Sequence, residues 1–295
     1  MRRSGRAATL MLVTMLAAGP VAAQASGGAT KQPPTKPPVK PPARIPVAPK
    51  DIPKEMPKPQ SPKVPETFEG LFAERDRRAV GALGYMRCME RVFSAGRSGQ
   101  LGRVPTAWGI TCIEQGKEWR GVFGEFSPEG ELDVRLQYAL RGTTGVVTKD
   151  PVDTGKVSGT ARALLRGLAA PLPGGGKFEV IPVPLALDKY IEVWFLPTPG
   201  DPSRILVGGD SLIQMSGDGG REFGHGRNSA PFRTLTVPPN ATSWTLQSVE
   251  ERIPAVSELI AAHRVLERIP EVKVVTNQYE SVLTRGARDW VHRRK

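Results

Sequence analysis

The chain has 295 residues, a formal net charge of +12 and 39% hydrophobic residues, enough for a folded domain with a sizeable core. The positive charge is unevenly spread, because residues 1–25 carry +3, residues 26–66 carry +5 and the rest of the chain only +4. This distribution excludes a domain-wide basic face. No aromatic residues alternate with basic ones in an RNA-binding pattern, so we expect no nucleic-acid partner.

The first 25 residues have the three parts of a secretory signal peptide. Three arginines form a positive start, an uncharged stretch follows over residues 7–19, and small residues then allow cleavage before Ser26 or before Gln24. An uncleaved membrane anchor is the alternative, but a spanning helix needs about 20 apolar residues and this stretch is shorter. We therefore expect a secreted protein, periplasmic or extracellular, with no transmembrane segment after signal cleavage.

Residues 26–66 are expected to form a disordered, extended linker. Thirteen prolines are interleaved with lysines over residues 33–65. Proline fixes φ and lacks an N–H, so the stretch can join neither helix nor sheet. It resembles the Pro-Lys periplasmic spacer of TonB-type proteins, although their C-terminal domain is not recognisable here. The resemblance implies a spacer that holds a domain away from a surface. Its lysines can contact anionic cell-envelope polymers.

Residues 67–150 are expected to form a subdomain made of a helix and an antiparallel meander. The helix is predicted from one apolar stripe with three- and four-residue steps, made by Ala79, Ala82, Met86, Met89 and Phe93. Three strands are expected at 110–114, 119–126 and 132–140, separated by turns. Cys88 and Cys112 are the two cysteines of an exported chain, so we predict that a disulfide joins the helix to the first strand. Two separate buried thiols are the alternative.

Residues 151–295 are expected to form a second α+β subdomain with mostly antiparallel strands, which makes the whole protein α+β. Asp153 and Thr154 are typical helix caps, and a later helix should begin near Pro254. The expected strands lie at residues 178–183, 190–196, 205–207, 212–215, 233–237 and 272–283. A basic tail follows the last of them.

The sequence GDSL at residues 209–212 resembles the nucleophile motif of the SGNH (GDSL-type) esterases. Asp289 and His292 have the D-x-x-H spacing that these enzymes place near their C-terminus. By this resemblance Ser211 would be the nucleophile, His292 its base and Asp289 the group that orients the imidazole. Asn228 would be the oxyanion donor. The resemblance implies a serine esterase as an alternative function.

The position of the motif argues against an esterase. In that family the motif opens the domain, at a junction between a strand and a helix, whereas Ser211 lies past the middle of this chain. The residues after it predict a strand and a hairpin turn at 216–220. We therefore expect Asp210 and Ser211 to bond only to local backbone, and Ser211 Oγ to lie far from His292.

The three histidines lack the spacing of a metal site, so we expect no metal and no cofactor. His225 is expected in a glycine-flanked turn, His263 on a helix face and His292 in the basic tail. These observations favour an exported, non-catalytic binding or interaction module associated with the cell envelope. Two alternatives stay open, an esterase built on Ser211 and a TonB-like or peptidoglycan-associated spacer protein.

Overall fold

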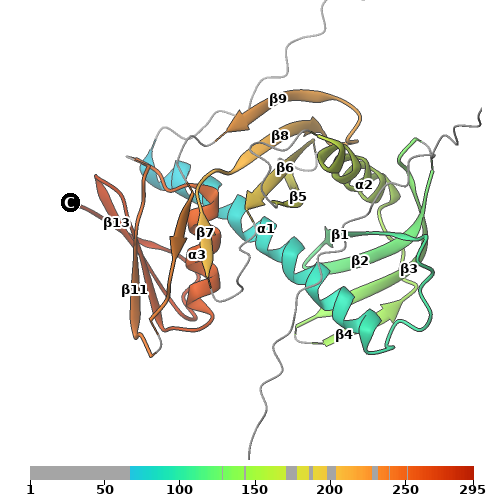
Figure 1. Ribbon diagram of the computed structural model, residues 1–295, viewed down its shortest axis with the longest axis horizontal. Coiled ribbons are helices and arrows are strands. Elements are labelled where there is room, and N and C mark those ends of the chain that lie inside the picture. Colours follow the sequence, from blue (N-terminus) through green and yellow to red (C-terminus); the bar gives the residue numbers. More distant parts are fainter. Residues whose placement is uncertain are drawn as a thin grey trace, which may run out of the picture. The chain divides into compact units, whose positions relative to one another are not determined.

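The structure is a computed structural model that describes residues 67–127, 129–142, 144–170, 178–185, 189–197, 204–227, 232–238, 240–250 and 252–295. The expected signal peptide, the Pro/Lys-rich linker and Asn228 lie outside the described residues. The described part of the chain is α+β, as predicted (Figure 1). None of its helices is long and apolar enough to cross a membrane.

The described helices are α1 (Phe68–Arg97), α2 (Thr154–Ala169) and α3 (Val256–Leu266). The first sheet has the order β1-β2-β3-β4, with β1 (Gly109–Gln115), β2 (Glu118–Phe126), β3 (Leu132–Arg141) and β4 (Thr144–Thr148). The middle sheet has the order β5-β6-β8-β9, with β5 (Phe178–Leu185), β6 (Tyr190–Pro197), β8 (Ser211–Ser216) and β9 (Glu222–Arg227). The C-terminal sheet has the order β11-β12-β13-β14, with β11 (Ser243–Gln247), β12 (Glu271–Val275), β13 (Tyr279–Thr284) and β14 (Val291–Arg294). A separate pair joins β7 (Ile205–Val207) to β10 (Arg233–Leu235).

Helix α1 begins at Thr67, whose hydroxyl accepts a hydrogen bond from the Gly70 N–H at 3.2 Å. The predicted disulfide between Cys88 and Cys112 is confirmed and ties this helix to β1. The predicted apolar stripe is only partly right, because Phe93 is 43% exposed and Val92 is fully buried instead. Gly121 of β2 explains the change: its missing side chain leaves room for Val92, which lies where a Cβ would be.

Helices α1 and α2 pack on opposite faces of the first and middle sheets (Figure 1). Both helices contact β1 and β5. Helix α2 starts at the predicted N-cap, Asp153, whose carboxylate accepts a hydrogen bond from the Lys156 N–H at 3.0 Å. Gly159 lets the helix approach the β8–β9 turn so closely that a Cβ there would lie 2.2 Å from the Gly217 carbonyl oxygen. The packing of α2 therefore fixes that turn.

The main core cluster contains residues from both sides of residue 150, including Phe72, Leu83, Ile181, Trp194 and Leu259. Helix α1 supplies many of them, so one helix organises core contacts with all three larger sheets. The boundary between the subdomains 67–150 and 151–295 stays a prediction.

The C-terminal portion departs from the sequence-based expectation at three places. Strand β11, helix α3 and the parallel strand β12 form a β-α-β crossover. The single strand expected at 272–283 is wrong, because Thr276 starts a turn and its hydroxyl accepts hydrogen bonds from Gln278 and Tyr279, which separates β12 from β13. The expected basic tail is not a free end, because its residues Val291–Arg294 form strand β14 at the edge of the sheet.

Candidate functional site

The structure does not bring the GDSL serine and the D-x-x-H histidine together. Ser211 begins β8 in the middle sheet, where it pairs with Phe195, whereas His292 lies on β14 in the C-terminal sheet. The imidazole Nδ1 of His292 lies 2.9 Å from the hydroxyl of Ser281, its cross-strand neighbour. Asp289 is exposed just before β14. The constellation that a serine nucleophile requires is therefore not assembled from these residues.

The Ser211 hydroxyl itself is buried and has no hydrogen-bond partner in the part of the chain that the structure describes. A catalytic serine needs a base within about 3 Å of its oxygen. As expected, a hairpin turn follows Ser211, with β8 leading into β9. The local sequence thus produces a strand entry where the esterases have a nucleophile.

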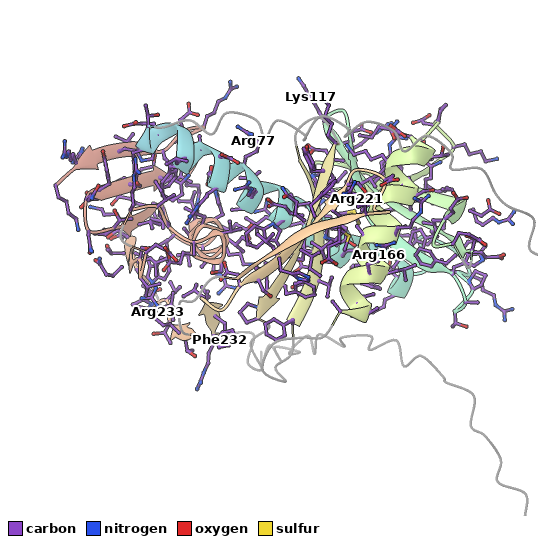
Figure 2. The ribbon with its side chains drawn as sticks, turned by 90° about the horizontal axis from the view of Figure 1, so that it is seen from above. Arg77, Lys117, Arg166, Arg221, Phe232 and Arg233 are labelled. Carbon is purple, nitrogen blue, oxygen red and sulfur yellow. A yellow bond between two sulfur atoms is a disulfide. The ribbon has the colours of Figure 1, made fainter. Side chains whose placement is uncertain are left out.

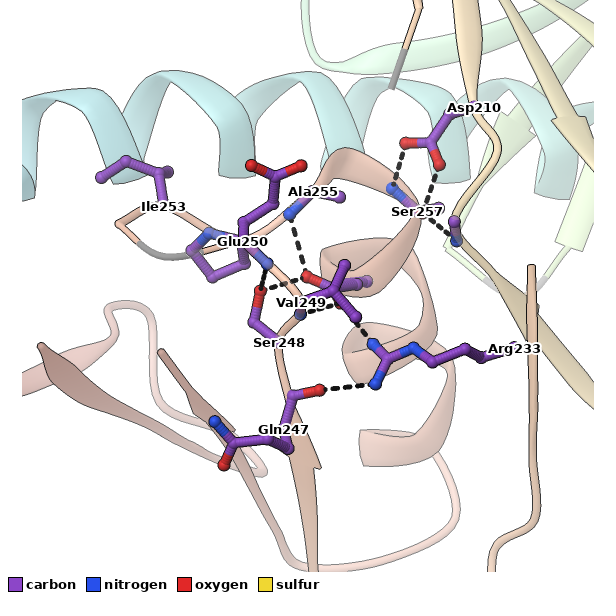
Figure 3. A network of polar contacts seen from close by, with 12 residues as sticks. Asp210, Arg233, Gln247, Ser248, Val249, Glu250, Ile253, Ala255 and Ser257 are labelled. Carbon is purple, nitrogen blue, oxygen red and sulfur yellow. Dashed lines mark hydrogen bonds and ion pairs between the residues drawn. The ribbon is translucent and has the colours of Figure 1, made fainter. Parts of the chain in front are cut away.

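Asp210, the acidic residue of the motif, has a structural role that reaches across the fold. Its buried carboxylate accepts hydrogen bonds from the Ser257 hydroxyl at 2.6 Å and from the Ser257 N–H at 3.2 Å (Figure 3). Ser257 Oγ in turn accepts a bond from the Gly208 N–H at 3.0 Å. The expected local backbone bonding of Asp210 is wrong, because the free N–H groups and the dipole at the start of α3 attract the carboxylate more strongly.

Glu258, the next residue of α3, is a second buried carboxylate at the same helix start. It accepts hydrogen bonds from the Ala255 and Val249 N–H groups at 3.0 and 3.2 Å and from the Ser248 hydroxyl at 2.6 Å. The guanidinium of Arg233 donates to it at 2.6 Å. Alanine cannot accept with its side chain, so only the glutamate half of a capping box forms here.

These bonds attach β7, β8, β10 and β11 to one helix end. Arg75 of α1 joins the same region by donating to the Ile253 and Pro254 carbonyl oxygens, both at 2.9 Å. Because both buried carboxylates, Asp210 and Glu258, are hydrogen-bonded, we interpret the cluster as a structural joint. The sequence signal for it was incomplete, since the cap residue is alanine and the partners are far apart in the chain.

A third buried carboxylate lies between α1 and the middle sheet. Glu192 of β6 accepts a hydrogen bond from the Trp194 indole N–H at 3.1 Å and pairs with Arg78 at 3.1 Å. Burial raises the pKa of Glu192, and Arg78 and Trp194 offset only part of that increase. Burial also raises the pKa of Glu179 on the neighbouring strand β5.

The histidines do not gather around a common centre for a metal. His225 lies in β9 rather than in a turn, 66% exposed in its side chain and 2.5 Å from Glu222 Oε1. His263 lies on α3 as expected, with Nε2 2.7 Å from Asp76 Oδ1. Within the described ranges no group of three or more His, Cys, Asp or Glu side chains could hold a metal ion.

A shallow groove of about 660 Å³ lies where three separate parts of the chain meet. They are the β2–β3 turn, the first half of α2 and the β8–β9 turn. Arg162 joins these walls, donating to the Asp218 carbonyl oxygen at 2.8 Å and to Glu131 at 3.2 Å. The charged side chains of the lining are Glu125, Glu131, Asp133, Arg162 and Asp218.

The groove carries net negative charge. Four carboxylates and one guanidinium line the groove, and Arg135, outside the lining, pairs with Asp133 at 2.7 Å. Hydrogen bonds from Ser216 and the Gly220 N–H lower the pKa of Asp218. Basic side chains labelled in Figure 2 lie outside this lining: Arg77 on α1, Arg166 on α2, Lys117 in the β1–β2 turn and Arg221 just before β9. The groove is thus an acidic site on a basic chain.

No family model, curated protein or solved structure matches this chain. The groove, the joint at the start of α3 and the histidine positions are therefore interpreted from their geometry and chemistry alone.

Proposed function

We propose that the mature protein is an exported, non-catalytic binding module, and that its folded part binds a cationic ligand in the groove between the β2–β3 turn, α2 and the β8–β9 turn. The observation that carries this proposal is the excess of carboxylates over guanidinium groups in that groove. Its size falls within the range of small-ligand sites, about 300–1,000 Å³. A polyamine or a lysine-rich peptide matches both the charge and the open shape.

Export is the other half of the proposal. It rests on the signal-peptide pattern of residues 1–25 and is consistent with the Cys88–Cys112 disulfide, which is typical of oxidising compartments. The lysines of residues 26–66 would add contacts with anionic envelope polymers. Recovery of protein that begins at Ser26 or Gln24 from the periplasmic or extracellular fraction, measured by intact mass, supports export. Recovery of the chain with Met1 in membranes contradicts it.

The binding proposal is tested by titrating the pure protein with spermidine and with a tetralysine peptide in a calorimeter. The double variant Glu131→Gln/Asp133→Asn removes two groove charges and should weaken binding about tenfold, since exposed charge pairs contribute about 0.2–1 kcal/mol each. Glu129→Gln is the matched control, because Glu129 is exposed in the same turn but does not line the groove. Equal binding by the double variant and the control would refute the groove as the site.

A further inference from the structure

Two histidines lie in one aromatic cluster between the start of α1, helix α3 and strand β14. The imidazole of His292 contacts the rings of Phe68 and Phe72, with centroid distances of 5.1 and 4.5 Å. Trp290 lies between Phe72 and His263, at 5.2 and 5.8 Å. The first turns of α1 are thus held against the C-terminal sheet through rings, two of which can take up a proton.

His292 is the histidine whose burial opposes a positive charge. Ser281, which bonds its Nδ1, is buried on β13, and the side toward α1 is closed by the two phenylalanine rings. His292 is itself half-buried in this contact. Burial accordingly lowers the pKa of His292.

The charged groups around His292 come from each neighbouring element. Helix α1 contributes Glu69 and Asp76, whose negative charges favour the protonated form and offset part of the effect of burial. Helix α3 contributes His263, which pairs with Asp76. Strand β13 contributes Tyr279, stacked on Phe68 at 3.6 Å, and β14 contributes Arg294 on the same strand face as His292.

We propose that this cluster is a pH-sensitive latch: protonation of His292 loosens residues 68–76, the first turns of α1, from the C-terminal sheet while the rest of the fold stays closed. The loosening is confined to the helix start because the disulfide at Cys88 fixes the later turns to β1. Helix ends also open at lower free energy than helix centres. The latch acts on the residues to which the Pro/Lys-rich stretch is joined, so acidification frees the attachment point of that stretch.

The direction of the pH effect on the latch follows from thermodynamic linkage. In the open form His292 titrates with its ordinary pKa of about 6.5, and in the closed form with a lower one, so the open form binds more protons. The closed latch is therefore most stable above pH 6.5 and weakens as the pH falls through this value toward the lower pKa. Each unit of difference between the two pKa values raises the opening equilibrium tenfold.

The test is amide hydrogen exchange of the full mature chain between pH 7.5 and 5, corrected for the intrinsic pH dependence of exchange. Protection at residues 68–76 should fall severalfold relative to β6 in the wild type and stay constant in His292→Gln, which keeps a hydrogen-bonding group but cannot titrate. His225→Gln should behave as the wild type, because His225 is exposed on β9. His263→Gln should also keep the pH dependence, which separates His292 from its neighbour.

Proton NMR of the wild-type imidazoles keeps the proposal falsifiable if His292→Gln does not fold. A His292 midpoint at or above 6.5 overturns the latch, and so does pH-independent protection of residues 68–76 in the wild type. If protection of residues 68–76 falls with pH equally in His263→Gln and in His292→Gln, another group causes the effect and the latch is refuted.

Discussion

The carboxylate of Asp210 accepts two hydrogen bonds from Ser257, a residue 47 positions later in the chain. One comes from the Ser257 hydroxyl and one from its backbone N–H, so the strand entry at β8 acts as an anionic cap on helix α3. A motif that resembles a catalytic signature thus joins two parts of the core.

Asp210→Ala should destabilise the protein by about 2–4 kcal/mol. It removes a charged acceptor from the helix start and leaves the Ser257 hydroxyl and N–H without that partner in a buried site. Urea unfolding followed by circular dichroism measures the change. The control is Asp289→Ala, which alters an exposed acid and should shift stability by no more than about 0.5 kcal/mol. Equal effects of the two variants would contradict the capping role.

Ser211→Ala should leave stability unchanged or raise it slightly, by up to about 1 kcal/mol. The Ser211 hydroxyl is buried with no partner among the described residues, so its removal relieves a desolvation cost. Turnover of short-chain p-nitrophenyl esters should be no different from that of the parent protein. Esterase activity that is lost in both Ser211→Ala and His292→Ala but kept in Ser216→Ala would restore the serine-hydrolase alternative.

Reduction of the Cys88–Cys112 bond should lower the free energy of unfolding by about 3 kcal/mol, as expected for a closed loop of this length. The two cysteines are 24 residues apart and join α1 to β1. A non-reducing peptide map should contain the linked pair, and a double Cys→Ala variant should reproduce the loss of stability. Two alkylatable thiols in the folded exported protein would contradict the prediction.

Glu192 should make stability depend on pH in the direction opposite to most carboxylates. Burial raises its pKa above the ordinary 4.5, so the native state holds its proton more tightly than the unfolded chain. Its stabilising contribution is fully present below pH 4.5 and is lost as the pH rises through the raised pKa. Relative to Glu192→Gln, the wild type should therefore lose stability over that interval in urea titrations at successive pH values. If the wild type instead gains stability relative to Glu192→Gln as the pH rises, the Arg78 ion pair outweighs burial.

Local signals predicted most of the fold. The N-cap at Asp153, the meander of β1 to β3 and the start of α3 near Pro254 each follow from patterns within a few residues, and the structure has them in place. Strands β4, β9, β11 and β14 were missed. They are short strands, and β4, β9 and β14 are rich in glycine, threonine or arginine. All four are held by pairing with other strands rather than by their own composition.

The structural joint at the start of α3 was harder to predict than the fold. Asp210 and Glu258 are bonded by groups on other elements, and neither the Ser257 contact nor the Arg233 pair has a local sequence signal. The groove likewise assembles from three segments that are distant in the chain, and only their packing against α2 brings Glu131 near Asp218. Features of this kind depend on tertiary packing, which periodicity does not encode.

Helix α1 also has a mechanical consequence. Residues 1–66 join the described chain at Thr67, so any tension that they carry enters this 30-residue helix at its first turn. The ring contacts of Phe68 and Phe72 would bear that load first, and the Cys88–Cys112 bond would then pass it covalently to β1. The helix would therefore distribute a pulling force over the core instead of letting the sheets detach one by one.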